Sequence, residues 1–181
     1  MYPVIVIFKA ETAARFSGLV LAVLLVGVQA ALAGPFDFNP EDTVTITADR
    51  AWEAQEPNVI HFSGKFVLHA PDWSMTGDTA VVYGELDDPD RVVVEGKPAT
   101  VSILRESDAA GGETDPGERV KGEANRVEYL RSTDRLIMKG SAWLLREESK
   151  LGSERIEYDV DTDRYSAGGE GGINFEYTPE E

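Results

Sequence analysis

The 181-residue chain contains no cysteine and only two histidines, which removes several kinds of reactive site. Without cysteine there is no disulfide framework, so the fold depends on its core. His61 and His69 flank Gly64 at polar positions of alternating segments, and they form no recognisable zinc cluster. Nucleophile elbows, phosphate loops and dinucleotide fingerprints are also absent. The sequence therefore predicts a protein that is not an enzyme and that needs no cofactor or metal.

Basic residues are scarce. Lysine and arginine number 17 against 33 aspartates and glutamates, which gives a formal net charge of −16. Such a surface repels nucleic acid and anionic lipid headgroups at long range. We expect no nucleic-acid partner, and solubility is the simplest explanation of the charge.

Long apolar runs are also lacking, apart from Gly18–Val28. Basic residues precede this run, and the small-residue motif Ala31–Ala33 follows it, as in a secretory signal peptide. The run is shorter than the roughly 20 residues that a membrane-spanning helix needs, so a retained anchor is the weaker alternative. We expect residues 1–33 to be cleaved and residues 34–181 to reach the periplasm.

The acidic residues include one spacing that resembles a calcium-binding loop. Asp159, Asp161, Asp163 and Glu170 occupy positions 1, 3, 5 and 12 of such a loop. Position 6 is Arg164, where the sharp turn requires glycine, and the flanking segments have the pattern of strands. We interpret the segment as an acidic hairpin turn and predict no metal site.

What the sequence does contain is alternation of apolar and polar residues after Asp42. Val44 and Ile46 alternate with threonines, and Val101 and Ile103 alternate with Thr100 and Ser102. A period of two with one polar side indicates half-buried antiparallel strands. Turn-forming clusters separate these segments, so we predict a dozen or more short strands and no long helix.

The alternating region also repeats itself. Gly64 and Gly140 each stand between two apolar segments, and the pattern Gly77-x5-Tyr83 returns as Gly152-x5-Tyr158, at offsets of 76 (140 − 64) and 75 (152 − 77). Such self-similarity marks a stacked architecture. We predict two halves at about 42–106 and 119–177, joined by the polar loop 107–118.

Several segments also resemble a known family in their order and spacing. They are Val44-Thr-Ile-Thr-Ala-Asp49, Phe62-Ser-Gly-Lys-Phe66, Gly96-Lys-Pro-Ala-Thr100, Val120-Lys-Gly-Glu-Ala124, Met138-Lys-Gly-Ser-Ala142 and Gly152-Ser-Glu-Arg-Ile-Glu-Tyr158. From Asp42 to Tyr177 the chain resembles the LptA family of lipopolysaccharide-export proteins, which have an OstA-like domain. The resemblance implies an all-β fold: an open, twisted β-jellyroll of two facing antiparallel sheets with an apolar groove.

The same resemblance implies the function and the partners. Members of the family form a periplasmic bridge that carries lipopolysaccharide from the inner to the outer membrane, with the acyl chains shielded in the groove. The expected partners are lipopolysaccharide, an LptC-like inner-membrane protein, an LptD-like outer-membrane translocon and further copies of the chain stacked head to tail.

Two sets of site residues follow from the resemblance and from the alternation. The residues expected to line the lipid groove are Val44, Ile46, Phe62, Phe66, Val101, Ile103, Tyr129 and Met138. Of these, Val44, Val101 and Tyr129 match positions that face the groove in the family. The edge strands expected to dock neighbouring domains contain Thr43, Val44, Thr45 and Ile46 at one end and Ile173, Asn174, Phe175 and Glu176 at the other.

Two other classes of function remain open from the sequence. One is a structural periplasmic module of the same fold, similar to LptC, that pairs by its edges and carries no lipid. The other is a polysaccharide-active hydrolase, which the absence of a distinct acid–base pair disfavours.

Overall fold

The computed structural model describes residues 4–8, 43–86, 88–105, 118–146 and 149–177, almost all of which are in strands. The strands are β1 (Val4–Phe8), β2 (Val44–Ala48), β3 (Arg50–Glu53), β4 (Val59–His69), β5 (Trp73–Glu85), β6 (Asp88–Arg105), β7 (Glu118–Leu130), β8 (Arg135–Arg146), β9 (Ser149–Asp159) and β10 (Arg164–Tyr177). A short 3-10 helix, η1 (Arg131–Thr133), precedes β8. No helix in these ranges is long and apolar enough to cross a membrane.

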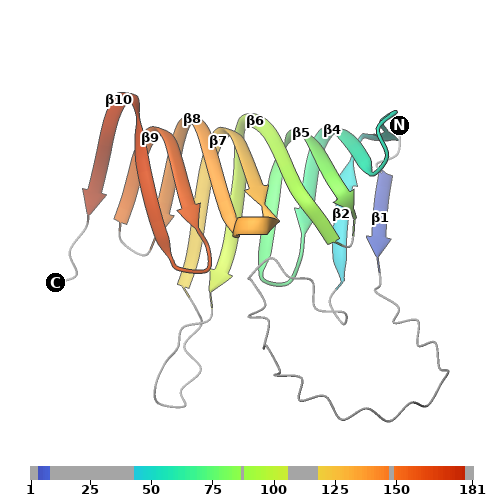
Figure 1. Ribbon diagram of the computed structural model, residues 1–181, viewed down its shortest axis with the longest axis horizontal. Coiled ribbons are helices and arrows are strands. Elements are labelled where there is room, and N and C mark those ends of the chain that lie inside the picture. The colour runs from blue at the N-terminus through green and yellow to red at the C-terminus, as the bar shows by residue number, and fades with distance from the viewer. Residues whose placement is uncertain (1–3, 9–42, 87, 106–117, 147–148, 178–181) are drawn as a thin grey trace, which may run out of the picture.

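All strand pairs are antiparallel and join into one sheet, which confirms the all-β prediction. The strand order is β1-β2-β4-β5-β6-β7-β8-β9-β10, with β3 paired separately to β4. Successive strands therefore follow one another along the long axis of the molecule, with β1 and β10 at opposite ends (Figure 1).

The strands are fewer and longer than the sequence suggested, and β6 reaches 18 residues. The reason is a line of register shifts that bends the strands without ending them. The shifts lie between Ser63 and Phe66, Thr76 and Thr79, Glu95 and Ala99, Glu123 and Arg126, Lys139 and Ala142, and Gly168 and Ile173. Bulges of this kind bend a strand and increase its twist. We call this line the crease; it divides the sheet into two facing walls.

The internal repeat is visible in the backbone at the crease. Gly64 and Lys65 have φ angles of 78° and 50°, and Gly140 and Ser141 have φ angles of 79° and 50°. Both pairs adopt the left-handed conformation that glycine accepts without a steric penalty. The two halves of the chain thus bend in the same way, at positions that are 76 residues apart (140 − 64).

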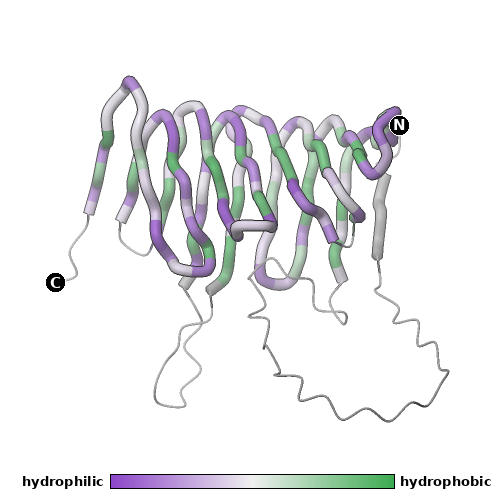
Figure 2. The backbone as a smooth tube through the Cα atoms, viewed as in Figure 1, coloured by the Kyte–Doolittle hydropathy of each residue, from purple (hydrophilic) through white to green (hydrophobic). Residues whose placement is uncertain are grey.

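The walls enclose an apolar core. One row of inward positions on the first wall joins Phe62, Ala80, Val94, Val127, Met138 and Ile156 in register. The matching row on the second wall joins Ile46, Leu68, Met75, Val101, Gly122, Leu144, Leu151 and Phe175. Figure 2 shows the resulting alternation of hydrophobic and hydrophilic segments along the strands. No polar or charged residue of the described ranges is buried.

Strand β1 lies inside the segment predicted to be a signal peptide. It pairs with β2 in the register Val6↔Ile46 and Phe8↔Val44. The edge of β2 is therefore occupied in the chain 1–181, and its exposure after cleavage of residues 1–33 stays a prediction. The predicted cleavage site and the loop 107–118 fall outside the described residues, except for Glu118, with which β7 begins.

Candidate functional site

The eight residues predicted to line a groove all lie in the interior. Their side chains are at most 6% exposed, and they come from both walls: Val44, Ile46, Phe62, Phe66, Val101, Ile103, Tyr129 and Met138. Phe62 and Phe66 stand on opposite sides of the crease with ring centroids 5.5 Å apart and planes tilted by 49°. The interior is therefore closely packed, and water does not reach these side chains.

The walls meet in the middle of the interior at Gly122 and Met138. A Cβ atom placed on Gly122 of the second wall would lie 2.5 Å from the sulfur of Met138 on the first wall. The same Cβ would lie 2.8 Å from a methyl group of Val101. Sequence reasoning did not single out Gly122, although a glycine inside an alternating strand is a signal of close approach.

Two tyrosines tie the interior to the turns that follow their strands. The hydroxyl of Tyr129 donates a 2.8 Å hydrogen bond to Asp134, and that of Tyr158 donates a 2.7 Å hydrogen bond to Asp163. Asp163 also accepts a hydrogen bond from Arg146 at 2.5 Å. The sequence carried a signal for both contacts, because a Tyr-x4-Asp pattern occurs at each position. Tyr129 thus lines the interior with a ring whose orientation is fixed at its polar end.

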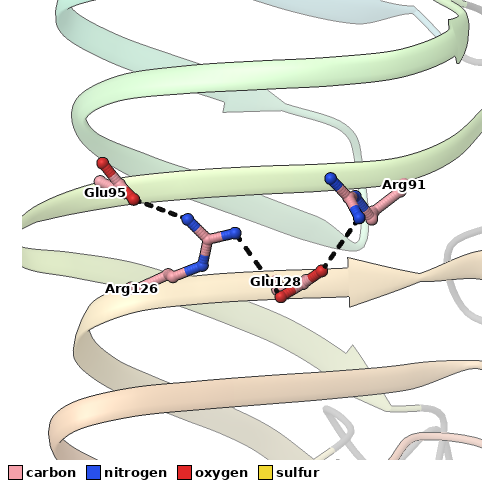
Figure 3. A network of polar contacts seen from close by, with 4 residues as sticks. All are labelled: Arg91, Glu95, Arg126 and Glu128. Atoms are coloured by element: carbon pink, nitrogen blue, oxygen red, sulfur yellow. Dashed lines mark hydrogen bonds and ion pairs between the residues drawn. The ribbon is translucent and has the colours of Figure 1, made fainter.

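Four charged side chains form a network on the outer face of the first wall (Figure 3). Arg126 of β7 donates a 2.6 Å hydrogen bond to Glu95 of β6 and lies 3.8 Å from Glu128. Arg91 completes the network at 3.7 Å from Glu128, and its guanidinium stacks 3.9 Å from the ring centre of Tyr83. The pair of Arg126 with Glu95 is 36% and 56% exposed, and ion pairs exposed to this degree contribute little stability. Their effect is to make the outer face polar, in contrast to the interior.

The acidic segment with calcium-loop spacing forms the turn between β9 and β10, as expected. Two of its carboxylates are hydrogen-bonded: Asp163 as described above, and Asp159, which accepts hydrogen bonds from the backbone amide and hydroxyl of Thr162. These bonds lower the pKa of Asp159, with smaller contributions from Arg135 and Arg164. An open, polar pocket of about 350 Å³ lies beside this turn, lined in part by Arg135, Asp159 and Arg164.

The two ends of the sheet differ. At the β10 end Ile173, Phe175 and Tyr177 are 60%, 54% and 63% exposed. Phe175 pairs with the buried Leu151, so these three side chains continue the inner face of the second wall beyond its covered part. At the other end Val44 and Ile46 are buried, and the backbone of β2 is paired with β1. The predicted docking segment in β10 therefore lies at one end of the sheet, whereas the segment in β2 is one strand in from the other end.

A continuous antiparallel sheet, folded at a crease around an apolar interior and ending in edge strands, defines an open β-jellyroll. A family model described as "LptA/(LptD N-terminal domain) LPS transport protein" matches residues 45–164. The chain belongs to this family, which is a family of transport proteins and not of enzymes. The match runs from β2 to the first residue of β10.

Individual relatives are distant. The lipopolysaccharide export system protein LptA of Escherichia coli K12 and that of Shigella flexneri are each 23% identical over 131 residues. This match covers 71% of the chain and 66% of each relative, just under two thirds. Among solved structures, LptH of Pseudomonas aeruginosa, a periplasmic LptA homologue, superposes with a TM-score of 0.64 at 20% identity. That superposition covers 75% of this chain and 95% of LptH and shows that the fold is shared.

Proposed function

We propose that this chain is a periplasmic lipid-binding bridge that carries lipopolysaccharide from the inner to the outer membrane by shielding its acyl chains between the two walls. The observation that carries the proposal is the continuity of the interior. The second-wall row runs from Ile46 in β2 to Phe175 in β10, and no polar side chain of the described residues is buried along it. Membership in a lipopolysaccharide transport family supports the same function.

The energetics require such a shield. Exposing apolar surface costs about 0.8 kcal/mol per CH2 group, so an acyl chain of about a dozen carbons costs on the order of 10 kcal/mol in water. Free diffusion of lipopolysaccharide through an aqueous compartment is therefore negligible. An interior whose inward residues are apolar on every strand offsets this cost along its whole length, without a deep polar pocket that would retain the cargo.

The close packing of the interior places a condition on this mechanism. Because Val101 and Tyr129 are each 3% exposed, an acyl chain contacts them only after side chains move or the walls separate. The walls join at the crease, so separation takes place on the side away from it. The protein then behaves as an elastic trough that opens around its cargo.

Head-to-tail stacking would extend the trough beyond one chain. The β10 end presents Ile173, Phe175 and Tyr177 on the inner face, and an edge strand with free backbone groups accepts a further strand by β-augmentation. Pairing of β10 with β2 of a second copy would bring the inner rows into line, once β1 has left β2. Neighbours of the same fold, an LptC-like protein and an LptD-like translocon, would pair in the same way at the two membranes.

The decisive experiment is conditional depletion of the protein in its own bacterium. If the protein is a bridge, lipopolysaccharide accumulates at the inner membrane, and re-expression of the full chain restores its delivery to the outer membrane. Normal delivery of lipopolysaccharide after depletion would contradict the proposal.

The packed interior also supports a second candidate, a structural module that pairs by its edges and carries no lipid. The two candidates differ in one property of the purified protein. A bridge binds a fluorescent fatty acid such as cis-parinaric acid between its walls, whereas a module that only pairs by its edges leaves the probe free.

A further inference from the structure

Gly122 occupies a position where glycine is not required by the backbone. No positive φ angle occurs at this residue, so a larger side chain would fit the backbone conformation of β7. Glycine in the interior of a strand is unfavourable relative to alanine. The reason for glycine here is therefore space, because the thioether of Met138 occupies the volume that a side chain would fill.

The side chain of Met138 can rotate out of the volume over Gly122. It is fully buried, and its side chain spans the interior from the first wall to the second. Methionine is unbranched and has three rotatable bonds, so it fills irregular gaps and moves aside at low cost. Its neighbours in the first-wall row, Val127 and Ile156, are branched and have less rotational freedom.

The residues around the contact between Gly122 and Met138 would also allow an acyl chain to displace the Met138 side chain. Gly122 is paired on one side with Val101, which is paired in turn with Met75. Met75 is the other methionine of the described residues and is likewise fully buried. On the crease side of this row lie small buried residues of the second wall: Ala99 pairs with Ala124, and Ala142 of β8 is buried as well. This cross-section thus combines flexible side chains with a wall of small ones.

Building on the proposed lipid-bridge function, we infer that Gly122 and Met138 form the constriction through which acyl chains pass. The acyl chain takes the place of the Met138 thioether over Gly122, and the side chain at position 138 sets how readily the interior is loaded. Rotation of Met138 would vacate the volume next to its sulfur, and Val101, whose methyl group lies 2.8 Å from a Cβ placed on Gly122, would remain beside the guest.

The inference is tested by binding of cis-parinaric acid to the full chain and to three variants. Met138→Ala leaves an apolar void over Gly122, and such voids bind apolar guests, so we expect binding tighter by about threefold or more. Gly122→Leu fills the same volume from the opposite wall, so we expect binding weaker by a similar factor. Val160→Ala is the control: Val160 is buried in the core but lies after β9, away from the rows, and its truncation should leave binding unchanged.

A second measurement does not depend on the folding of any variant. A fatty acid with a diazirine near the middle of its chain is irradiated with the unaltered protein, and the adducts are mapped by mass spectrometry. We expect adducts on the β7 and β8 peptides that contain Gly122 and Met138.

The outcomes separate the two proposals. One outcome is that the protein binds the fatty acid but neither the position 138 nor the position 122 substitution changes the affinity, or that the adducts map elsewhere. The proposal of a constriction at Gly122 and Met138 is then wrong, while the proposed lipid-bridge function is not contradicted. If neither the unaltered protein nor any variant binds the fatty acid, both the proposed lipid-carrying function and the proposed constriction are contradicted.

Discussion

The hydroxyl of Tyr158 donates a 2.7 Å hydrogen bond to a carboxylate oxygen of Asp163, which stands five positions later at a φ angle of 55°. Tyr129 and Asp134 repeat this arrangement with a distance of 2.8 Å and a φ angle of 45°. In both cases a buried ring in the first wall is tied to the turn that leads into the next strand. The tyrosines thus fix where the wall ends, while their rings remain part of the apolar interior.

Replacing Tyr158 by phenylalanine tests how much this tie contributes. Tyr158→Phe keeps the ring but removes the donor to a charged acceptor, a bond worth about 1.5–3 kcal/mol. Since Asp163 keeps Arg146 as a partner, we expect a loss of about 1.5 kcal/mol in the free energy of unfolding, measured in urea. Tyr165→Phe, at a ring that is 44% exposed, is the control and should change stability by less than about 0.5 kcal/mol. Equal effects of the two substitutions would contradict this role.

The crease should tolerate change at some glycines and not at others. Gly64 has a φ angle of 78°, and a Cβ atom there would collide with the carboxylate of Asp49, whose backbone amide donates a hydrogen bond to the Gly64 carbonyl. We expect Gly64→Ala to cost about 2 kcal/mol or more, seen as a lower midpoint of thermal unfolding. Gly171 has no positive φ angle and no neighbour within 4 Å, so Gly171→Ala should be nearly neutral. A stable Gly64→Ala variant would show that the bend does not need this conformation.

The alternation was sufficient to predict which side of several strands faces the interior. Val101 and Ile103 are buried while Thr100 and Ser102 are not, as the period of two required. The length of the strands was not predictable in the same way. β6 continues through Gly96 and Pro98, because the bulge absorbs the extra residues while pairing resumes on both sides.

Contacts between the two walls could not be predicted from the sequence. Gly122 and Met138 lie in neighbouring strands, but their meeting depends on the fold at the crease and not on the register of β7 with β8. Similarly, the pairing of β1 with β2 joins a segment of the predicted leader to the domain, and no local pattern indicates it. Local periodicity thus specifies the faces of strands, whereas the closure of the interior is a tertiary property.

The β9–β10 turn should respond to acid through Asp159. Hydrogen bonds from Thr162 hold the pKa of this carboxyl below its ordinary value, so its contribution to stability is present above that ordinary pKa, near 4. The contribution is lost as the pH falls through the lowered pKa of the folded state. We expect Thr162→Val to lower the urea midpoint slightly at neutral pH and to converge with the unaltered protein at the acid end. A difference that grows on acidification would contradict this assignment.

Removal of residues 1–33, the predicted leader, should control self-association. In the full chain β1 occupies the edge of β2, whereas a chain of residues 34–181 leaves that edge free to accept β10 of a second copy. We expect the chain 34–181 to form linear oligomers that lengthen with concentration in sedimentation experiments, and the full chain to remain smaller. Deleting residues 172–181 should abolish the oligomers. An unchanged size distribution after that deletion would contradict head-to-tail pairing.

The central claim, that acyl chains travel between the walls, is tested most directly by photo-crosslinking in cells. A small diazirine amino acid is placed at Val101, whose side chain faces the interior, and separately at Glu123, which is exposed on the outer face of the neighbouring strand. The account predicts that lipopolysaccharide is captured at position 101 and not at position 123. Capture at neither position, or equal capture at both, would contradict it.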